Sequence, residues 1–122
     1  MRTTIKATGS VLLTEELKVF VDEKVEKLAK VLGESEAALA EVEVGSVSNA
    51  RTGDMFRAEI NISFDGLLVR AEASRETLHM AIDEAVDEAR RRIRRSRTKH
   101  RDLIRRGAAR VKDVFRYFRG KS

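Results

Sequence analysis

The sequence contains no cysteine and only two histidines, and these shortages narrow the chemistry that the chain can perform. Without cysteine there is no disulfide framework, no thiolate metal site and no thiol nucleophile. The remaining residues show no Ser-His-Asp set, no metal-ligand spacing and no paired-carboxylate cleft. The sequence therefore predicts a protein that is not an enzyme and that carries no metal and no cofactor.

The chain also lacks a long apolar segment. No apolar run approaches the roughly 20 residues that a membrane-spanning helix needs. The N-terminus does not show the basic start and apolar stretch that mark a secretory signal. We therefore expect a cytoplasmic protein.

Aromatic residues are scarce as well, at 5% of the chain, whereas charged residues make up 37%. Residues 1–88 carry ten Lys or Arg against eighteen Asp or Glu, and residues 89–122 carry fifteen against two. Such a positive field at one end of the chain favours a polyanionic partner, nucleic acid first and an anionic membrane second. With few rings to stack on bases, contact with phosphates is the expected mode of binding.

At 122 residues the chain is long enough for one domain with a modest core. An alternating pattern predicts a short strand over residues 2–8. Thr14 is suited to cap a helix over residues 14–32, in which apolar residues recur at helical spacing, and Gly33 is suited to end it.

Two further alternating segments, residues 38–44 and 56–64, are predicted strands, and the second leads into a tight turn. Asp65-Gly66 is typical of a two-residue type I′ turn, because both central positions need a positive φ. The register set by this turn pairs Phe64 with Leu67, Ile62 with Val69, Ile60 with Ala71, Ala58 with Ala73, Asn61 with Arg70 and Glu59 with Glu72.

A second long helix is predicted from about residues 74–77 to near residue 100. Its apolar stripe, projected at about 100° per residue, continues through the segment ARRRIRRSRTKHR at 89–101. The basic residues of this segment therefore belong to a docked helix. These eight residues, which we call the arginine cluster, are Arg90, Arg91, Arg92, Arg94, Arg95, Arg97, Lys99 and Arg101.

The predicted order β-α-β-β-β-α indicates an α+β fold. We expect a two-layer sandwich, with a four-stranded mixed sheet and both helices on its one apolar face. The α+β domain is expected to occupy residues 1–101, and a basic amphipathic tail residues 102–122. For the tail, a docked helix and a basic arm that orders on RNA are both left open.

The arginine cluster has two possible interpretations. As a solvated helix face, it would be partly neutralised by pairs of Asp87 with Arg91 and of Glu88 with Arg92, each worth only about 0.2–0.5 kcal/mol. As a nucleic-acid surface, a polyanion would relieve the mutual repulsion of the cations, and we favour this interpretation. On the projection, Arg90, Arg94, Arg97 and Arg101 form one row, and Arg91, Arg95 and Lys99 form another.

Lys24 projects into the apolar stripe of the first helix. One possibility is that its stem lies along that stripe with the ammonium group in solvent. The other is that it lies between the two helices, where the ammonium group would meet a phosphate.

Three segments carry a resemblance to a known family: IKATGSVLLTEELKVFVDEKVEKL at 5–28, AEINISFDGLLVRAEAS at 58–74 and AIDEAVDEARRRIRRSR at 81–97. In order and spacing they resemble the bacterial ribosome hibernation-promoting factors and ribosome-associated inhibitors, also called sigma-factor modulation proteins. The resemblance implies a non-enzymatic protein that binds the small ribosomal subunit in stationary phase or stress. It would inhibit translation by filling the channel used by messenger and transfer RNA.

The resemblance also implies a short form without the C-terminal domain by which long members pair ribosomes. Whether residues 102–122 promote or block such pairing is left open. Family-like basic positions fall in both helices, and we expect no membrane and no small-molecule substrate as partners. The residues expected to contact ribosomal RNA are Lys24, Lys27, Arg90, Arg91, Arg94, Arg95, Arg97, Lys99 and Arg101.

Two other functions are considered. A double-stranded-RNA-binding-like domain has the order α-β-β-β-α, which is contained in the predicted order, but the leading strand at residues 2–8 argues against it. A regulator whose basic tail binds an acidic protein would show salt-sensitive binding to a protein and none to RNA.

Overall fold

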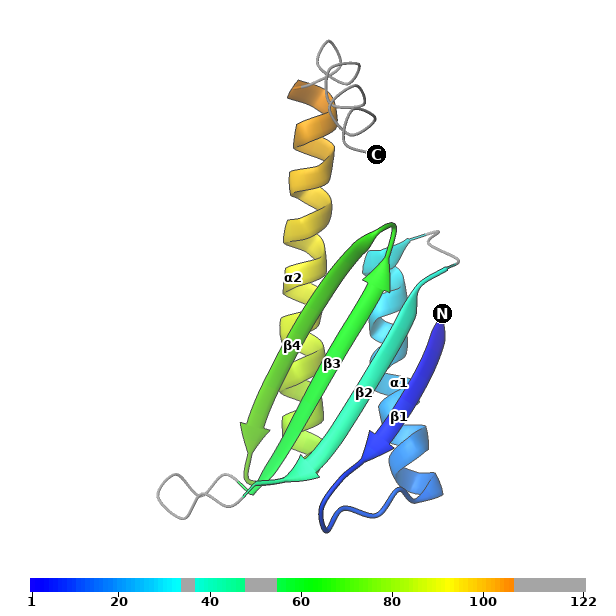
Figure 1. The fold of residues 1–122 in the computed structure, drawn as a ribbon, viewed down its shortest axis with the longest axis vertical. Coiled ribbons are helices and arrows are strands. Elements are labelled where there is room, and N and C mark those ends of the chain that lie inside the picture. The colour runs from blue at the N-terminus through cyan, green and yellow to red at the C-terminus, as the bar shows by residue number, and fades with distance from the viewer. Residues whose placement is uncertain (34–36, 48–54, 107–122) are drawn as a thin grey trace, which may run out of the picture.

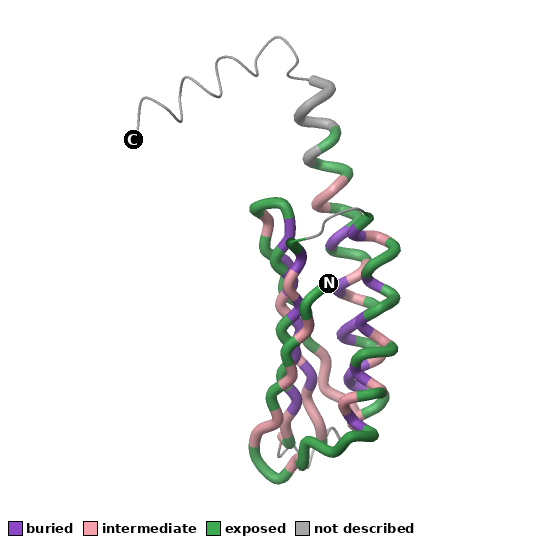
Figure 2. Tube along the Cα trace, turned by 90° about the vertical axis from the view of Figure 1, so that its right-hand side faces the viewer, coloured by how far each residue is buried: buried purple, intermediate pink, exposed green. Residues whose placement is uncertain are grey.

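The computed structural model describes residues 1–33, 37–47 and 55–106, which form two layers (Figures 1 and 2). The elements are β1 Arg2–Ala7, α1 Glu15–Leu32, β2 Leu39–Ser46, β3 Phe56–Phe64, β4 Leu67–Arg75 and α2 Leu78–Arg106. The sheet has the order β1-β2-β3-β4, with β1 parallel to β2 and the other neighbours antiparallel. Both helices cover one face of it, so the predicted α+β sandwich is confirmed (Figure 2).

The start and end of α1 follow the predicted local chemistry. Thr14 has an extended backbone, and its side chain accepts a hydrogen bond of 3.1 Å from the N–H of Leu17. Gly33 has a φ of 66° and donates its N–H to the carbonyl of Ala29 at 3.1 Å.

The β3–β4 hairpin has the predicted register throughout. Asp65 and Gly66 have φ values of 48° and 75°, as a type I′ turn requires. All six predicted residue pairs are present, from Phe64 opposite Leu67 to Ala58 opposite Ala73. A turn of two residues and the alternation of apolar side chains both specify this pairing, so local and tertiary preferences agree.

The ends of two elements differ from the prediction. Strand β2 is Leu39–Ser46, whereas residues 38–44 were predicted. Helix α2 begins after Thr77, whose hydroxyl accepts from the N–H of Met80 at 3.2 Å, and continues to Arg106. It therefore passes the predicted end near residue 100, since the sequence offers no helix-breaking glycine or proline before Gly107.

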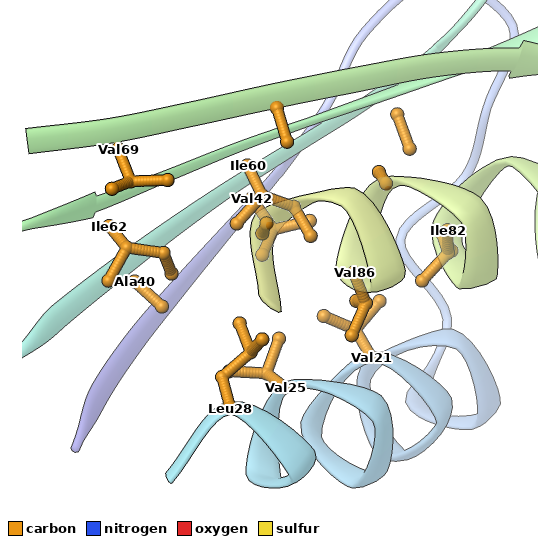
Figure 3. Close-up of a cluster of buried hydrophobic side chains, with 14 of the residues drawn as sticks. Val21, Val25, Leu28, Ala40, Val42, Ile60, Ile62, Val69, Ile82 and Val86 are labelled. Carbon is orange, nitrogen blue, oxygen red and sulfur yellow. The ribbon is translucent and has the colours of Figure 1, made fainter. Parts of the chain in front are cut away.

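The core lies between the helices and the sheet. Side chains from both layers meet there, including Val21 and Leu28 of α1, Ile60 and Ile62 of β3, and Ile82 of α2, all almost fully buried (Figure 3). No polar or charged side chain of the described residues is buried. No described helix combines the length and apolar character needed to cross a membrane.

The two helices run in the same direction, so their N-termini lie at one end of the domain and their C-terminal ends at the other (Figure 1). Helix α2 extends past the end of the sheet, and the arginine cluster is in this half of the helix. The cluster is therefore close to the C-terminal end of α1, where unpaired carbonyls carry partial negative charge.

Candidate nucleic-acid interface

The arginine cluster is part of a packed helix, as its apolar stripe predicts. Ala89 and Ile93 are fully buried on the face of α2 that meets the sheet and α1. At one turn of helix per 3.6 residues, the neighbouring positions then face the flanking elements or the solvent. The structure thus divides the cluster among three environments: the α1 side, the β4 side and the solvent.

Two members of the cluster attach α2 to its neighbours. On one side, Arg97 Nη1 donates to the carbonyl of Val31, in the last turn of α1, at 2.7 Å. On the other side, Arg92 Nη1 donates to the carbonyl of Arg70 in β4, also at 2.7 Å. A Cβ atom at Gly33 would lie 3.0 Å from the Arg97 guanidinium group, so glycine leaves space for this cap.

Glu88 is paired with three members of the cluster. Its carboxylate oxygens lie 2.8 Å from Arg91, 2.9 Å from Arg92 and 3.4 Å from Arg95. Hydrogen bonds from Arg92 and then Arg91 lower the pKa of Glu88 to about 2. The pair of Glu88 with Arg92, expected if the cluster were a solvated helix face, is therefore present. Arg91 pairs with Glu88 instead of Asp87, because one Glu88 oxygen accepts from two of its N–H groups, and Asp87 acts on Arg91 only as a nearby negative charge.

The other cluster residues lie towards solvent. Arg94, Lys99 and Arg101 are exposed, and Arg90 is half-buried. Because Arg97 reaches α1, the row that contains it runs along the α1 side of the helix. The row of Arg91, Arg95 and Lys99 lies on the other side, towards β4 and solvent.

Lys24 lies between the helices, as one of its two predicted placements has it, but it meets an acid there. Its Nζ atom is 2.9 Å from Asp83 Oδ1 and 5.3 Å from the centre of the Phe20 ring. The hydrogen bond to Asp83 raises the pKa of Lys24. Phe20 in turn packs edge-on against His79, with ring centres 4.2 Å apart. Lys27, one turn further along α1, is exposed.

The residues expected from the sequence to contact RNA did not include Arg92 or Arg70. Arg92 was expected to be partly neutralised by Glu88 if the cluster were a solvated helix face, and Arg70 was placed only in the hairpin register. Their contact joins residues 22 positions apart, and no local pattern encodes it. Within the described residues, no group of His, Asp or Glu could hold a metal ion.

This α+β domain, with its cations gathered on α2, belongs to a known class. The family model for the Sigma 54 modulation protein / S30EA ribosomal protein matches residues 5–101. The chain therefore belongs to this family of non-enzymatic, ribosome-associated proteins, and the resemblance found in its sequence is confirmed.

Individual relatives agree with this assignment. The chain is 29% identical over 92 residues to a ribosome hibernation promotion factor of Picosynechococcus sp., a match that covers 75% of this chain and 47% of that protein. The chain thus spans about half the length of this curated relative.

Two solved structures share the fold. The N-terminal domain of Thermus thermophilus Protein Y matches with a TM-score of 0.66 and 27% identity, covering 78% of this chain and 98% of that one. A ribosomal subunit interface protein from Coxiella burnetii matches with a TM-score of 0.64 and 11% identity, covering 80% and 99%.

Proposed function

We propose that this protein is a ribosome hibernation factor that inhibits translation in the cytoplasm. It binds ribosomal RNA of the small subunit, in the channel used by messenger and transfer RNA, through the basic faces of α1 and α2. Family membership supports the association with ribosomes. The observation that carries the RNA-binding part is the arginine cluster, which a packed helix presents on two sides with few acidic partners.

The residues of this surface differ in their proposed roles. Arg90, Arg94 and Arg101 on one side, with Arg91, Arg95 and Lys99 on the other, contact phosphates directly. Arg97 contributes mainly as a positioning residue, because its guanidinium group already caps α1. Lys24 is 23% exposed and paired with Asp83, so it adds less to phosphate binding than the exposed Lys27 does.

Each of the two alternative functions leaves a feature of the structure unexplained. A double-stranded-RNA-binding-like domain has no counterpart of β1, which is paired with β2 over six residues here. A regulator that binds an acidic protein through residues 102–122 would leave the two arginine rows of α2 without a role. Residues 102–122 themselves lie largely outside the described residues.

Co-sedimentation with separated small and large ribosomal subunits, across a salt series, tests the proposal. We expect binding to the small subunit that weakens with salt, with log K falling by about 0.7–0.9 per phosphate contact for each log unit of salt. An in vitro translation assay in parallel should show loss of protein synthesis at protein concentrations that saturate the subunit.

A matched pair of variants locates the site. Arg94→Gln with Arg101→Gln should reduce the salt slope by about 1.4–1.8, if each residue contacts one phosphate. Arg2→Gln with Lys6→Gln removes the same charge from exposed positions of β1, at the opposite edge of the sheet, and should leave the slope unchanged. Absence of subunit binding at low salt would contradict the proposal.

A further inference from the structure

We propose that the groove between the outer edge of β4 and α2 holds the sugar-phosphate backbone of one RNA strand. This inference rests on the function proposed above and specifies the surface that the RNA follows. The groove has a volume of about 400 Å³, and its walls include Leu68 and Arg70 of β4 and Arg92, Arg95, Ser96 and Lys99 of α2.

The α2 wall of the groove is cationic along its length. Arg92, Arg95 and Lys99 are exposed and follow one another at intervals of three and four residues, so they share one side of the helix. From Arg92 to Lys99 the helix rises by about 10 Å. This wall is therefore long enough to face more than one phosphate of a strand that runs along it.

The β4 wall presents hydrogen-bond donors. β4 ends the strand order, so one side of its backbone faces away from the sheet. The carbonyl of Arg70 points to that side, because it accepts from Arg92. In an antiparallel strand the N–H and C=O of one residue point the same way, and the N–H of Arg70 therefore faces the groove as well. Since Arg92 covers the carbonyl oxygen of Arg70, the N–H of that residue is left to donate to an anion.

Two uncharged residues border the groove. Leu68 lies at its rim, with a side chain that is 70% exposed on the open face of the sheet because the neighbouring Val69 faces the core. The apolar faces of a ribose or base would cover it. Ser96 is half-buried and offers a hydroxyl group, which suits a phosphate oxygen. Alternating apolar and anionic contacts are what a nucleic-acid strand provides.

Glu88 orients the cations of the groove. Its ion pairs with Arg92 and Arg95 hold both guanidinium groups on the groove side of α2. One carboxylate cannot neutralise two arginines and Lys99, so the wall stays net positive. A phosphate would find the cations already oriented, which reduces the entropy lost on binding.

The first experiment is photo-crosslinking of the full chain bound to purified small ribosomal subunits. A photoreactive amino acid at position 68 should form an adduct with ribosomal RNA. The same amino acid at position 4, where Thr4 is exposed on β1 at the opposite edge of the sheet, should give no such adduct. Adducts of position 68 with ribosomal protein alone, or no adduct there while binding persists, would overturn the proposal that RNA lies in this groove.

The second experiment compares two charge pairs on the same helix. Arg95→Gln with Lys99→Gln should lower the salt slope of subunit binding by about 1.4–1.8. Between about 1 M and 0.1 M salt, the affinity of this variant should therefore rise roughly 25- to 60-fold less than the affinity of the wild type. An unchanged slope for this variant, together with a reduced slope for Arg94→Gln with Arg101→Gln, would reject binding of RNA in the groove and leave intact the proposal that the protein binds the small subunit, through the row of Arg94 and Arg101. Failure of the wild-type chain to bind small subunits would reject both.

Discussion

Glu88 has a carboxyl group whose ionisation should be coupled to folding, because its pKa is lowered to about 2 by hydrogen bonds from Arg92 and Arg91. A carboxyl with a depressed pKa stabilises the fold above its unfolded pKa, near 4.5, and loses this contribution as the pH falls towards 2. Glu88→Gln should therefore be less stable than the wild type at neutral pH, with the difference disappearing near pH 2.

Denaturant unfolding at several pH values measures this difference. Carbon-detected NMR of the Glu88 carboxyl gives its titration directly and should place the midpoint well below the ordinary value. Glu23→Gln, at an exposed position of α1, is the control and should change the unfolding free energy by less than about 0.5 kcal/mol. A Glu88 midpoint near 4.5 would mean that the three ion pairs do not persist in solution.

Arg97 should contribute to stability in a way that Arg94 does not. Its guanidinium group caps a last-turn carbonyl of α1 at 2.7 Å, and hydrogen bonds of charged groups are worth about 1.5–3 kcal/mol when well formed. Because the contact is partly solvated, we expect Arg97→Gln to cost about 1 kcal/mol of unfolding free energy.

Arg94→Gln is the matched control, since it removes the same charge from an exposed position of the same row. It should stay within about 0.5 kcal/mol of the wild type. Hydrogen exchange of amides in the last turn of α1 should rise for the Arg97 variant alone. Equal stability of the two variants would mean that the hydrogen bond from Arg97 to α1 does not stabilise the fold.

At the scale of the element, Ile93 determines whether the basic half of α2 stays docked. It is fully buried between arginines on both sides in the sequence. Ile93→Ala should cost about 2–5 kcal/mol, because it leaves a cavity where the helix meets the core. Chemical denaturation measures the loss, and Val19→Ala at an exposed position of α1 should cost little.

Hydrogen exchange gives a second measure for this helix. Amides near residues 94–101 should exchange faster in the Ile93→Ala variant than those near the start of α2. A change below about 1 kcal/mol, with protection intact, would indicate that the cluster forms a helix independently of docking.

At the scale of the whole molecule, the charge distribution separates stability from binding. The buried apolar residues of the described chain all lie between Leu17 and Ile93. Residues 107–122 carry five Lys or Arg against one Asp, so removing them lowers the net charge from +5 to +1. We expect a chain that ends at Arg106 to keep its unfolding free energy to within about 0.5 kcal/mol, and to bind small subunits more weakly at low salt.

Calorimetry and the salt series together test this expectation. Loss of more than about 1 kcal/mol on truncation would mean that residues 107–122 pack against the domain. The division into a domain at 1–101 and a tail at 102–122 would then be wrong. That division remains a prediction, and α2 itself continues for five residues beyond its boundary.

The sequence by itself determined the elements and their pairing. Period-two and period-3.6 patterns, the cap at Thr14 and the Asp65-Gly66 turn act between near neighbours, so they can be read without knowing the fold. The hairpin register and the burial of Ile93 amid arginines followed from such local rules. The helix end near residue 100 was the least reliable of these predictions, because nothing in the sequence marks an end before Gly107.

Only the tertiary structure decided which basic side chains already have a partner within the domain. Lys24 meets Asp83, Arg97 meets the carbonyl of Val31, and Arg92 meets the carbonyl of Arg70. Each contact joins two elements, and two of the acceptors are backbone oxygens that every residue type possesses. A long flexible side chain can reach any of several such partners, so its choice depends on how the helices and the sheet edge are placed.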